Sequence, residues 1–324
     1  MLQVSQEFET GYVVGADIGG TSLRLALAAM DGKVLGKWKV STTGIRDPHV
    51  VVRLITEGVD HLLQQNSITR SLLRAVAAGA PGVTNVDEGV VIATSYLMGW
   101  RNVPLRALLE AKLGVPAAVE NDVNVAAIAE SKIGAARGVR DFVFVALGTG
   151  IGAGVVLNGE IFHGMNWSAG EIGYLLVPGT PVTPVETGEP GALESVVGGE
   201  GIKAQWRNVW REDLTQHPRE LVATQVFDYA LAGDALARQV LDKSAQTLAY
   251  AIYNLAIVLN CPLFVLGGTV GMHPALWTAT RDILSQRDKR VQPDLLRSRL
   301  GSDAQVNGAI HLAIETATSR VLTS

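Results

Sequence analysis

Three glycine-rich turns are the first residues in the sequence whose types and spacing could do chemistry. They are Asp17-Ile-Gly-Gly-Thr21, Gly148-Thr149-Gly150 and Gly267-Gly268. Glycine lets several backbone N–H groups converge on an oxyanion where a Cβ atom would obstruct them. Thr21 adds a hydroxyl donor, and Asp17 could orient hydrated Mg²⁺. The set suggests a phosphate site. Taken singly, the first turn is explained as well by a glycine hairpin with a structural aspartate, and the third is better explained by packing.

The second turn also invites comparison with dinucleotide-binding folds. The glycines from Gly148 onward superficially match G-x-G-x-x-G, but Gly154 falls one residue late. A strand is expected after the turn, whereas the dinucleotide motif requires a helix there. That interpretation fails, and a second phosphate-facing turn remains.

Carboxylates form the second group of candidate residues. Asp122 follows Asn121, and a carboxylate beside a hydroxyl group can accept its proton during phosphoryl transfer. The competing interpretation is that Asn121 or Asp122 caps a helix that starts at Val123, and both can hold at once. Glu171 and Glu194 could accept hydrogen bonds from several sugar hydroxyls. Taken alone, each glutamate is more simply a solvated surface residue.

Two copies of one local plan must position these residues. In residues 13–40 and again in residues 142–162, an apolar strand ends in a Gly/Thr turn, a second strand follows, and an Asx-Gly pair leads into a third strand. Helical spacing predicts helices at residues 50–65, 105–113, 123–133 and 241–259, and further strands are expected at 75–80, 115–119 and 262–266. Strands that alternate with helices indicate an α/β fold, here built by duplication.

Composition excludes several classes of protein. The 324 residues are 48% hydrophobic and 18% charged with a net charge of −4, so a disordered chain, a coiled coil and a collagen-like repeat are excluded. The acidic balance argues against affinity for nucleic acids or anionic membranes. Cys261 is the single cysteine, and the most apolar stretch, residues 251–266, is interrupted by polar residues and a proline. With no secretory signal at the start, we expect a soluble, cytoplasmic protein.

The motifs together resemble a family. The chain resembles sugar kinases of the ROK family, within the actin/hexokinase/Hsp70-like ATPase superfamily. The resemblance covers nearly the whole chain, and four sugar-site segments occur in the family's order between the three turns: Ala80-Pro-Gly82, Glu120-Asn-Asp122, Gly170-Glu-Ile-Gly173 and Leu193-Glu194. It implies a two-domain actin/hexokinase-like (ribonuclease H-like) α/β fold with a duplicated βββαβα core and an interdomain cleft. The implied domains are residues 1–119 plus 305–324 and residues 120–304, with a C-terminal helix at 308–321 folded back onto the first.

The resemblance also implies a role for each candidate residue. Asp122 would be the general base, and the substrate-binding residues would be Gly82, Asn121, Asp122, Glu171, Tyr174 and Glu194. ATP would be held by Asp17, Gly19, Gly20, Thr21, Gly148, Thr149, Gly150, Gly267 and Gly268, with Mg²⁺ held by Asp17 through water. The implied reaction moves the γ-phosphoryl group of ATP to the 6-hydroxyl of a hexose, with glucose as the first candidate. The expected partners are hexose and ATP, with no nucleic acid and no membrane, and a homodimer or higher homo-oligomer is expected.

Other functions stay open at this stage. Within the family, the substrate could instead be an N-acetylhexosamine or fructose. From other classes, the alternatives are a sugar-responsive transcriptional regulator and a catalytically silent sugar-binding protein. Only 16 residues precede Asp17, too few for the helix-turn-helix domain of such a regulator. The presence of Asp17, Thr21 and Asp122 argues against a silent protein.

Departures from the family pattern concern the sugar pocket. ROK proteins commonly bind a structural zinc through a histidine and a cysteine cluster, but Tyr174 stands at the histidine position and residues 185–192 contain no cysteine. We therefore expect no zinc. Tyr174 either offers its hydroxyl to the sugar or packs as an apolar surface. Ser95-Tyr96 stands where many relatives carry a sugar-contacting asparagine. His163 lacks companion ligands and is interpreted as a surface or core histidine.

Overall fold

A computed structural model of the chain describes residues 11–94, 97, 99–183 and 189–321. The chain forms two compact units. The N-terminal unit extends to Lys132 and also takes in His163–Ser168 and the chain from Asp303 onward. The second unit comprises Ile133–Phe162 and Ala169–Ser302. Asn121 and Asp122 therefore belong to the N-terminal unit.

The N-terminal unit is built on a five-stranded sheet of order β3-β2-β1-β4-β8. Its strands are β1 (Tyr12–Ile18), β2 (Ser22–Ala29), β3 (Val34–Ser41), β4 (Leu73–Ala80) and β8 (Ala117–Asn121). The first three are antiparallel, whereas β1, β4 and β8 run parallel. The carboxyl ends of the parallel strands therefore lie at one edge of the sheet, where Asp17 pairs with Gly79 and Gly79 with Glu120.

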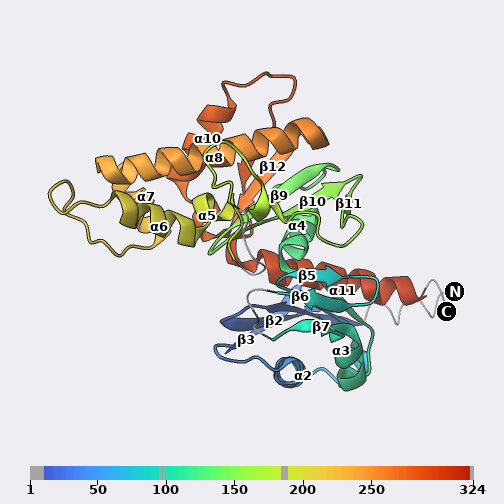
Figure 1. The fold of residues 1–324 in the computed structure, drawn as a ribbon. Coiled ribbons are helices and arrows are strands. Elements are labelled where there is room, and N and C mark those ends of the chain that lie inside the picture. Colours follow the sequence, from blue (N-terminus) through green and yellow to red (C-terminus); the bar gives the residue numbers. More distant parts are fainter. Residues whose placement is uncertain (1–10, 95–96, 98, 184–188, 322–324) are drawn as a thin grey trace. The chain divides into compact units, whose positions relative to one another are not determined.

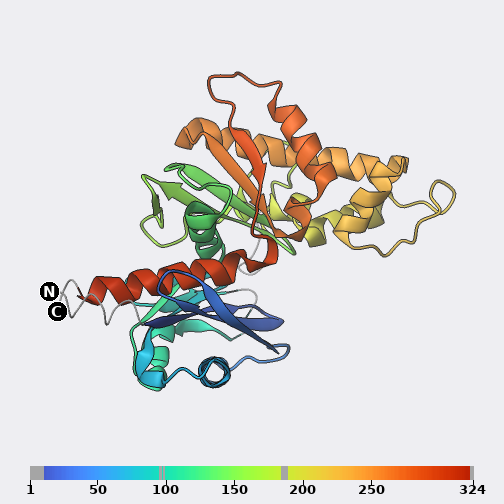
Figure 2. The same ribbon diagram turned by 180° about the vertical axis from the view of Figure 1, so that it is seen from behind.

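Helices cover both faces of this sheet, as Figures 1 and 2 show from opposite sides. One face packs on α2 (Pro48–Gln65) and α3 (Leu105–Leu113), and the other packs on α11 (Ala304–Val321). Gly308 makes a close approach possible, because a Cβ there would lie 1.6 Å from the backbone oxygen of Val125 in α4 (Asp122–Ile133). The unit also contains a small sheet of three strands, β5 (Val83–Asn85), β6 (Val90–Ala93) and β7 (Arg101–Val103). Two short helices complete it: η1 (Arg70–Leu72), and η3 (Gly301–Asp303), where the chain re-enters this unit.

The second unit repeats the same sheet. Its order is β11-β10-β9-β12-β13, with antiparallel pairing up to β9 and parallel pairing beyond it. The strands are β9 (Phe142–Leu147), β10 (Ile151–Leu157), β11 (Glu160–Ile161), β12 (Leu263–Gly267) and β13 (Asp294–Arg297). The duplicated α/β architecture expected from the two Asx-Gly hairpins is confirmed, and the third strand of the second copy ends one residue earlier than predicted.

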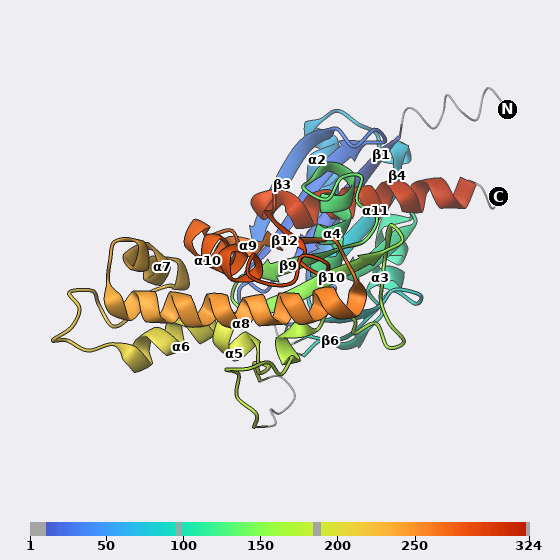
Figure 3. The same ribbon diagram turned by 90° about the horizontal axis from the view of Figure 1, so that it is seen from above.

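The long helix α8 (Ala235–Leu259) organises the helices of the second unit, as seen from above in Figure 3. It packs against α5 (Glu194–Val197), α6 (Gly199–Val209), α7 (Ala223–Leu231) and α10 (Pro274–Leu284). Short helices η2 (Ile172–Tyr174) and α9 (Gly268–Gly271) lie next to the sheet strands β10 and β9. Trp206 is fully buried in this core and donates its indole N–H to the Pro218 oxygen at 3.1 Å. In the part of the chain that the structure describes, no helix is long and apolar enough to cross a membrane.

Candidate functional site

The first glycine turn is a braced hairpin tip between β1 and β2. The Gly19 amide donates to the Ser22 oxygen at 2.9 Å, and the Thr42 hydroxyl donates to the Gly19 oxygen at 2.6 Å. The Thr42 amide also donates to the Thr21 oxygen at 3.1 Å. Gly20 and Thr21 themselves are exposed at the tip. The carbonyl groups of the turn are thus held by the protein, while its tip is open to a ligand.

Asp17, at the end of β1, is held by Arg24. The two residues are cross-strand partners, and the Arg24 Nε and Nη2 atoms lie 2.8 and 2.7 Å from the same carboxylate oxygen, Oδ2. Burial raises the pKa of Asp17, and the Arg24 guanidinium opposes that shift. A carboxylate held in this way fits the outer shell of hydrated Mg²⁺, which carboxylates bind through water. Sequence reasoning missed Arg24, although hairpin register places it opposite Asp17.

The second turn, Gly148-Thr149-Gly150, is braced by the start of α6. The Gly199 amide donates to the Gly148 oxygen at 2.9 Å, and the Glu200 amide donates to the Thr149 oxygen at 3.2 Å. Within the turn, the Gly148 amide donates to the Gly150 oxygen at 3.0 Å. A Cβ at Gly148 would meet nothing within 4 Å, so the turn borders open space. The Gly-Gly-Glu-Gly run at residues 198–201 is the sequence signal for this support.

The third turn owes its glycines to packing. A Cβ on Gly267 would lie 2.4 Å from the Phe144 ring, and one on Gly268 would lie 2.1 Å from the Leu147 oxygen. Gly268 also has a φ of +77°, which favours glycine. Parallel pairing of β12 with β9 places Gly267 opposite Ala146, so this turn and the second turn follow adjacent strand ends.

The turn from β8 into α4 carries Asn121 and Asp122. The Asn121 Oδ1 accepts from the amides of Val123 and Asn124 at 2.8 and 3.1 Å, which makes it the helix cap. Its Nδ2 donates to the Gly82 oxygen at 3.0 Å, and Gly82 adopts a φ of +93°. Asp122 is the first residue of α4, and its Oδ1 accepts from the Val123 amide at 2.9 Å. The carboxylate thus sits at the positive end of the helix dipole, a favourable place for negative charge.

Glu120 and His163 extend this turn into a network. His163 Nε2 lies 2.7 Å from Glu120 Oε2, while Glu120 Oε1 accepts from the Asn121 amide at 2.7 Å and from the Asn124 side chain at 3.0 Å. The hydrogen bond to Glu120 raises the pKa of His163, partial burial opposes the shift, and the charges of Glu120 and Asp87 add to it. The interpretation of His163 as an unremarkable histidine missed this pairing. Nothing in the local sequence indicates a partner 43 residues away.

The candidate sugar residues of the second unit lie close together. Glu171 precedes η2, Tyr174 ends it, and Glu194 opens α5. Glu194 Oε2 accepts from the Ile151 amide at 2.9 Å, which ties it to the residue directly after the second glycine turn. Burial of the carboxyl raises the pKa of Glu171, and the charge of Glu194 raises it further. Two carboxylates that repel each other in this way suit a ligand that donates hydrogen bonds.

Tyr174 is 50% exposed. Desolvation raises the pKa of its hydroxyl, followed by the charges of Glu171 and Glu194. The hydroxyl thus lies near two carboxylates, and its role in sugar contact stays a prediction.

The residues at the family's zinc positions do not fit a zinc ion. Tyr174 stands in place of the family's histidine, and residues 185–192 contain no cysteine. Gly191 instead packs directly on η2, since a Cβ there would lie 2.3 Å from the Gly173 oxygen. Within the described part of the chain, no group of three or more His, Cys, Asp or Glu side chains could hold a metal ion. Residues 184–188 and Ser95-Tyr96 lie outside the described residues.

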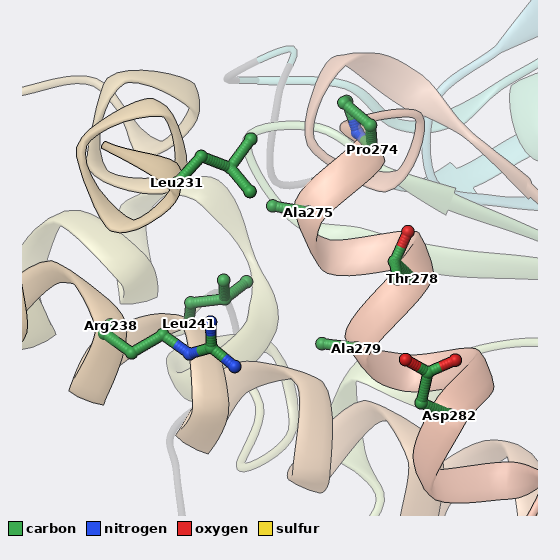
Figure 4. Close-up of a pocket in the computed structure, with 8 residues that line it drawn as sticks. All are labelled: Leu231, Arg238, Leu241, Pro274, Ala275, Thr278, Ala279 and Asp282. Carbon is green, nitrogen blue, oxygen red and sulfur yellow. The ribbon is translucent and has the colours of Figure 1, made fainter. Parts of the chain in front are cut away.

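A hollow of about 210 Å³ lies apart from these residues, between α7, α8 and α10. Figure 4 shows its largely apolar lining, with Arg238 on α8 and Asp282 on α10 at its border. It shares no residue with the three glycine turns or with the acidic groups described above.

Comparison with known proteins bears on the whole chain. The family model described as "ROK family" matches residues 13–316. The chain is 35% identical to a glucokinase of Halalkalibacterium halodurans over 270 residues, which cover 80% of each chain. It is 30% identical over 300 residues to an N-acetylmannosamine kinase of Salmonella arizonae, covering 92% of this chain and 96% of that one. The crystal structure of a ROK family glucokinase from Streptomyces griseus in complex with glucose and AMPPNP has a TM-score of 0.77 and 24% identity, covering 94% of this chain and 100% of that one.

Proposed function

The chain belongs to the ROK family and is a sugar kinase of the hexokinase/glucokinase type, and we propose that it transfers the γ-phosphoryl group of ATP to the 6-hydroxyl of a hexose, glucose in the first place, with Asp122 as general base. The observation that carries the proposal is the register of the N-terminal sheet. It brings the carboxyl ends of β1, β4 and β8 to one edge, and with them the Asp17 turn, Gly82 and Asp122. Ligands of α/β sheets bind at this edge.

In the proposed reaction, the 6-hydroxyl oxygen forms a bond to the γ-phosphorus, and the bond from that phosphorus to the β–γ bridging oxygen breaks, so that ADP leaves. Asp122 takes the hydroxyl proton, a contribution typically worth ~10²–10⁴-fold in rate. Bound Mg²⁺, held through water by Asp17, would neutralise charge on the phosphoryl oxygens. The amides of the exposed Gly20–Thr21 tip and of the second turn would donate to the phosphates.

In this proposal, the sugar is held by hydrogen bonds to its hydroxyl groups. Glu171 and Glu194 accept hydrogen bonds from sugar hydroxyls, and the Tyr174 hydroxyl takes the place of the family's histidine. The side-chain oxygen of Asn121 caps α4, and its amide group donates one hydrogen bond to the Gly82 oxygen. The second hydrogen of that amide group would donate to a sugar oxygen. Gly82 acts mainly by holding Asn121.

A second candidate substrate is an N-acetylhexosamine. The relative that is an N-acetylmannosamine kinase favours it, and so does the Tyr174 substitution, because it changes the pocket at a position that family members use for sugar contact. The regulator and the silent sugar-binding protein would bind sugar without turnover.

The test is a coupled ADP-release assay with glucose, mannose, fructose and the N-acetylhexosamines, run with the wild-type protein and with Asp122→Asn. ATP and sugar binding are measured in parallel by calorimetry. Turnover that is greatest with glucose supports the proposal, and turnover only with an N-acetylhexosamine would establish the second candidate. Binding of both ligands with no turnover on any sugar would overturn the kinase proposal.

A further inference from the structure

The segment His163–Ser168 is a short excursion of the chain. It belongs to the N-terminal unit, although the residues before and after it, up to Phe162 and from Ala169, belong to the second unit. His163 opens the excursion, and its Nε2 lies 2.7 Å from Glu120 Oε2. The His163 side chain is 27% exposed and that of Glu120 is 6% exposed. The excursion therefore begins with a bond to a nearly buried carboxylate.

Glu120 also hydrogen-bonds to the β8–α4 turn, which carries the proposed base. Its other oxygen accepts from the Asn121 amide at 2.7 Å and from the Asn124 side chain in the first turn of α4 at 3.0 Å. Asp122 lies between these two residues. Losing one partner of a buried charged group is costly, because the group is left without solvent or a partner. Glu120 would then move toward water and release the Asn121 amide and the Asn124 side chain.

We propose that His163 is a positioning residue for phosphoryl transfer: by holding Glu120 it fixes the β8–α4 turn, and so the direction of the Asp122 carboxylate, most firmly when the imidazole is protonated. The inference rests on the proposed function of Asp122 and adds a residue that touches neither sugar nor nucleotide.

The charges around His163 give this role a pH dependence. Glu120 on β8 and Asp87 in the turn between β5 and β6 both face it, and both are acidic. The pKa of His163 is raised, first by the hydrogen bond to Glu120. Protonation of the imidazole adds an ion pair to a hydrogen bond whose acceptor is already a carboxylate. The positioning contact is therefore strongest below the raised pKa and weakens as pH rises through it, while the neutral ring can still donate Nε2–H.

Two substitutions of His163 distinguish the effect of its hydrogen bond to Glu120 from the effect of its positive charge. His163→Gln keeps a neutral donor, whereas His163→Leu removes it. Relative to the wild type, His163→Leu is expected to lower kcat by about tenfold with KM for ATP changed less than about twofold, because Asp122 remains but is misdirected. The wild-type kcat is expected to fall about two- to fivefold as pH rises from about 6.5 to about 8.5. His163→Gln is expected to show no such decline. His49→Gln, an exposed histidine at the start of α2, is the matched control with the wild-type profile.

A spectroscopic readout keeps the test valid if a variant folds poorly. The imidazole of His163, followed by nuclear magnetic resonance in the wild type and in Glu120→Gln, is expected to titrate at lower pH in the variant. Equal titration in both, or wild-type kcat and pH profile in His163→Gln together with His163→Leu, would overturn the inference. Absence of wild-type turnover with every sugar would instead overturn the proposed function, and the two failures are thereby distinguished.

Discussion

Replacing Gly199 by alanine tests whether the start of α6 supports the second phosphate turn. A Cβ at this position would lie 2.6 Å from the Gly148 oxygen, whereas real Cβ atoms keep at least 3.0 Å. The turn and the helix must therefore separate by about 0.4 Å, and the 2.9 Å bond from the Gly199 amide to Gly148 weakens. The strain of overpacking costs ~1–3 kcal/mol, and the hydrogen bond is worth ~0.5–1.5 kcal/mol.

This loss of free energy in Gly199→Ala predicts the outcome of two measurements. Together these terms amount to ~1.5–4.5 kcal/mol, so the unfolding temperature is expected to fall by about 3–18 °C, at ~2–4 °C per kcal/mol for a unit of this size. Because misplacement by ~1 Å can cost ~10²-fold, kcat/KM for ATP is expected to fall on the order of tenfold, while calorimetric affinity for the sugar in the absence of ATP changes little.

Gly233→Ala is the matched control. Gly233 lies in the same unit and has a φ of +98°, but a Cβ there would meet nothing within 4 Å. This variant should lose about 1–2 kcal/mol through backbone strain with an unchanged KM for ATP. If Gly199→Ala matched this control, with lower stability and wild-type kinetics for ATP, the reasoning about the turn would be refuted.

Two further predictions concern the sugar residues. The pKa of Glu171 is raised, so its carboxylate is lost on acidification earlier than that of an ordinary glutamate; KM for the sugar should rise several-fold from about pH 7 to about pH 5, and this rise should disappear in Glu171→Gln, whose KM is already high at neutral pH. A pH-independent KM in the wild type would contradict the acceptor role. Elemental analysis of the purified protein should find no stoichiometric zinc, and chelator treatment should leave activity unchanged, because Tyr174 stands in place of the family's histidine and residues 185–192 contain no cysteine; one zinc per chain would refute this prediction.

The duplicated fold could be predicted because its signals are local. Asp31-Gly32 and Asn158-Gly159 mark the hairpins, and each copy repeats a strand, a glycine turn and a strand within about thirty residues. The identical strand orders of the two sheets confirm that interpretation. The order of the three glycine turns and the four sugar-site segments along the chain was also enough to identify the family, because many weak motifs in one sequence are together more selective than any single motif.

The contacts that support the candidate site could not be predicted, because they join distant parts of the chain. The Asp17–Arg24 pair depends on hairpin register, the Gly199–Gly148 bond on the position of α6, and the Glu120–His163 pair on the excursion at 163–168. The role of the third glycine turn was ambiguous in the sequence for a physical reason. Gly267 and Gly268 are required by packing against Phe144 and Leu147, so their glycine character alone does not indicate a ligand.

The central claim is that Asp122 takes the proton of the attacking hydroxyl. Asp122→Asn tests it most directly, because asparagine keeps an oxygen for the Val123 amide and so preserves the start of α4. We expect an unfolding temperature and a sugar affinity close to those of the wild type, with kcat reduced by ~10²–10⁴-fold. A folded Asp122→Asn variant with wild-type kcat would contradict it.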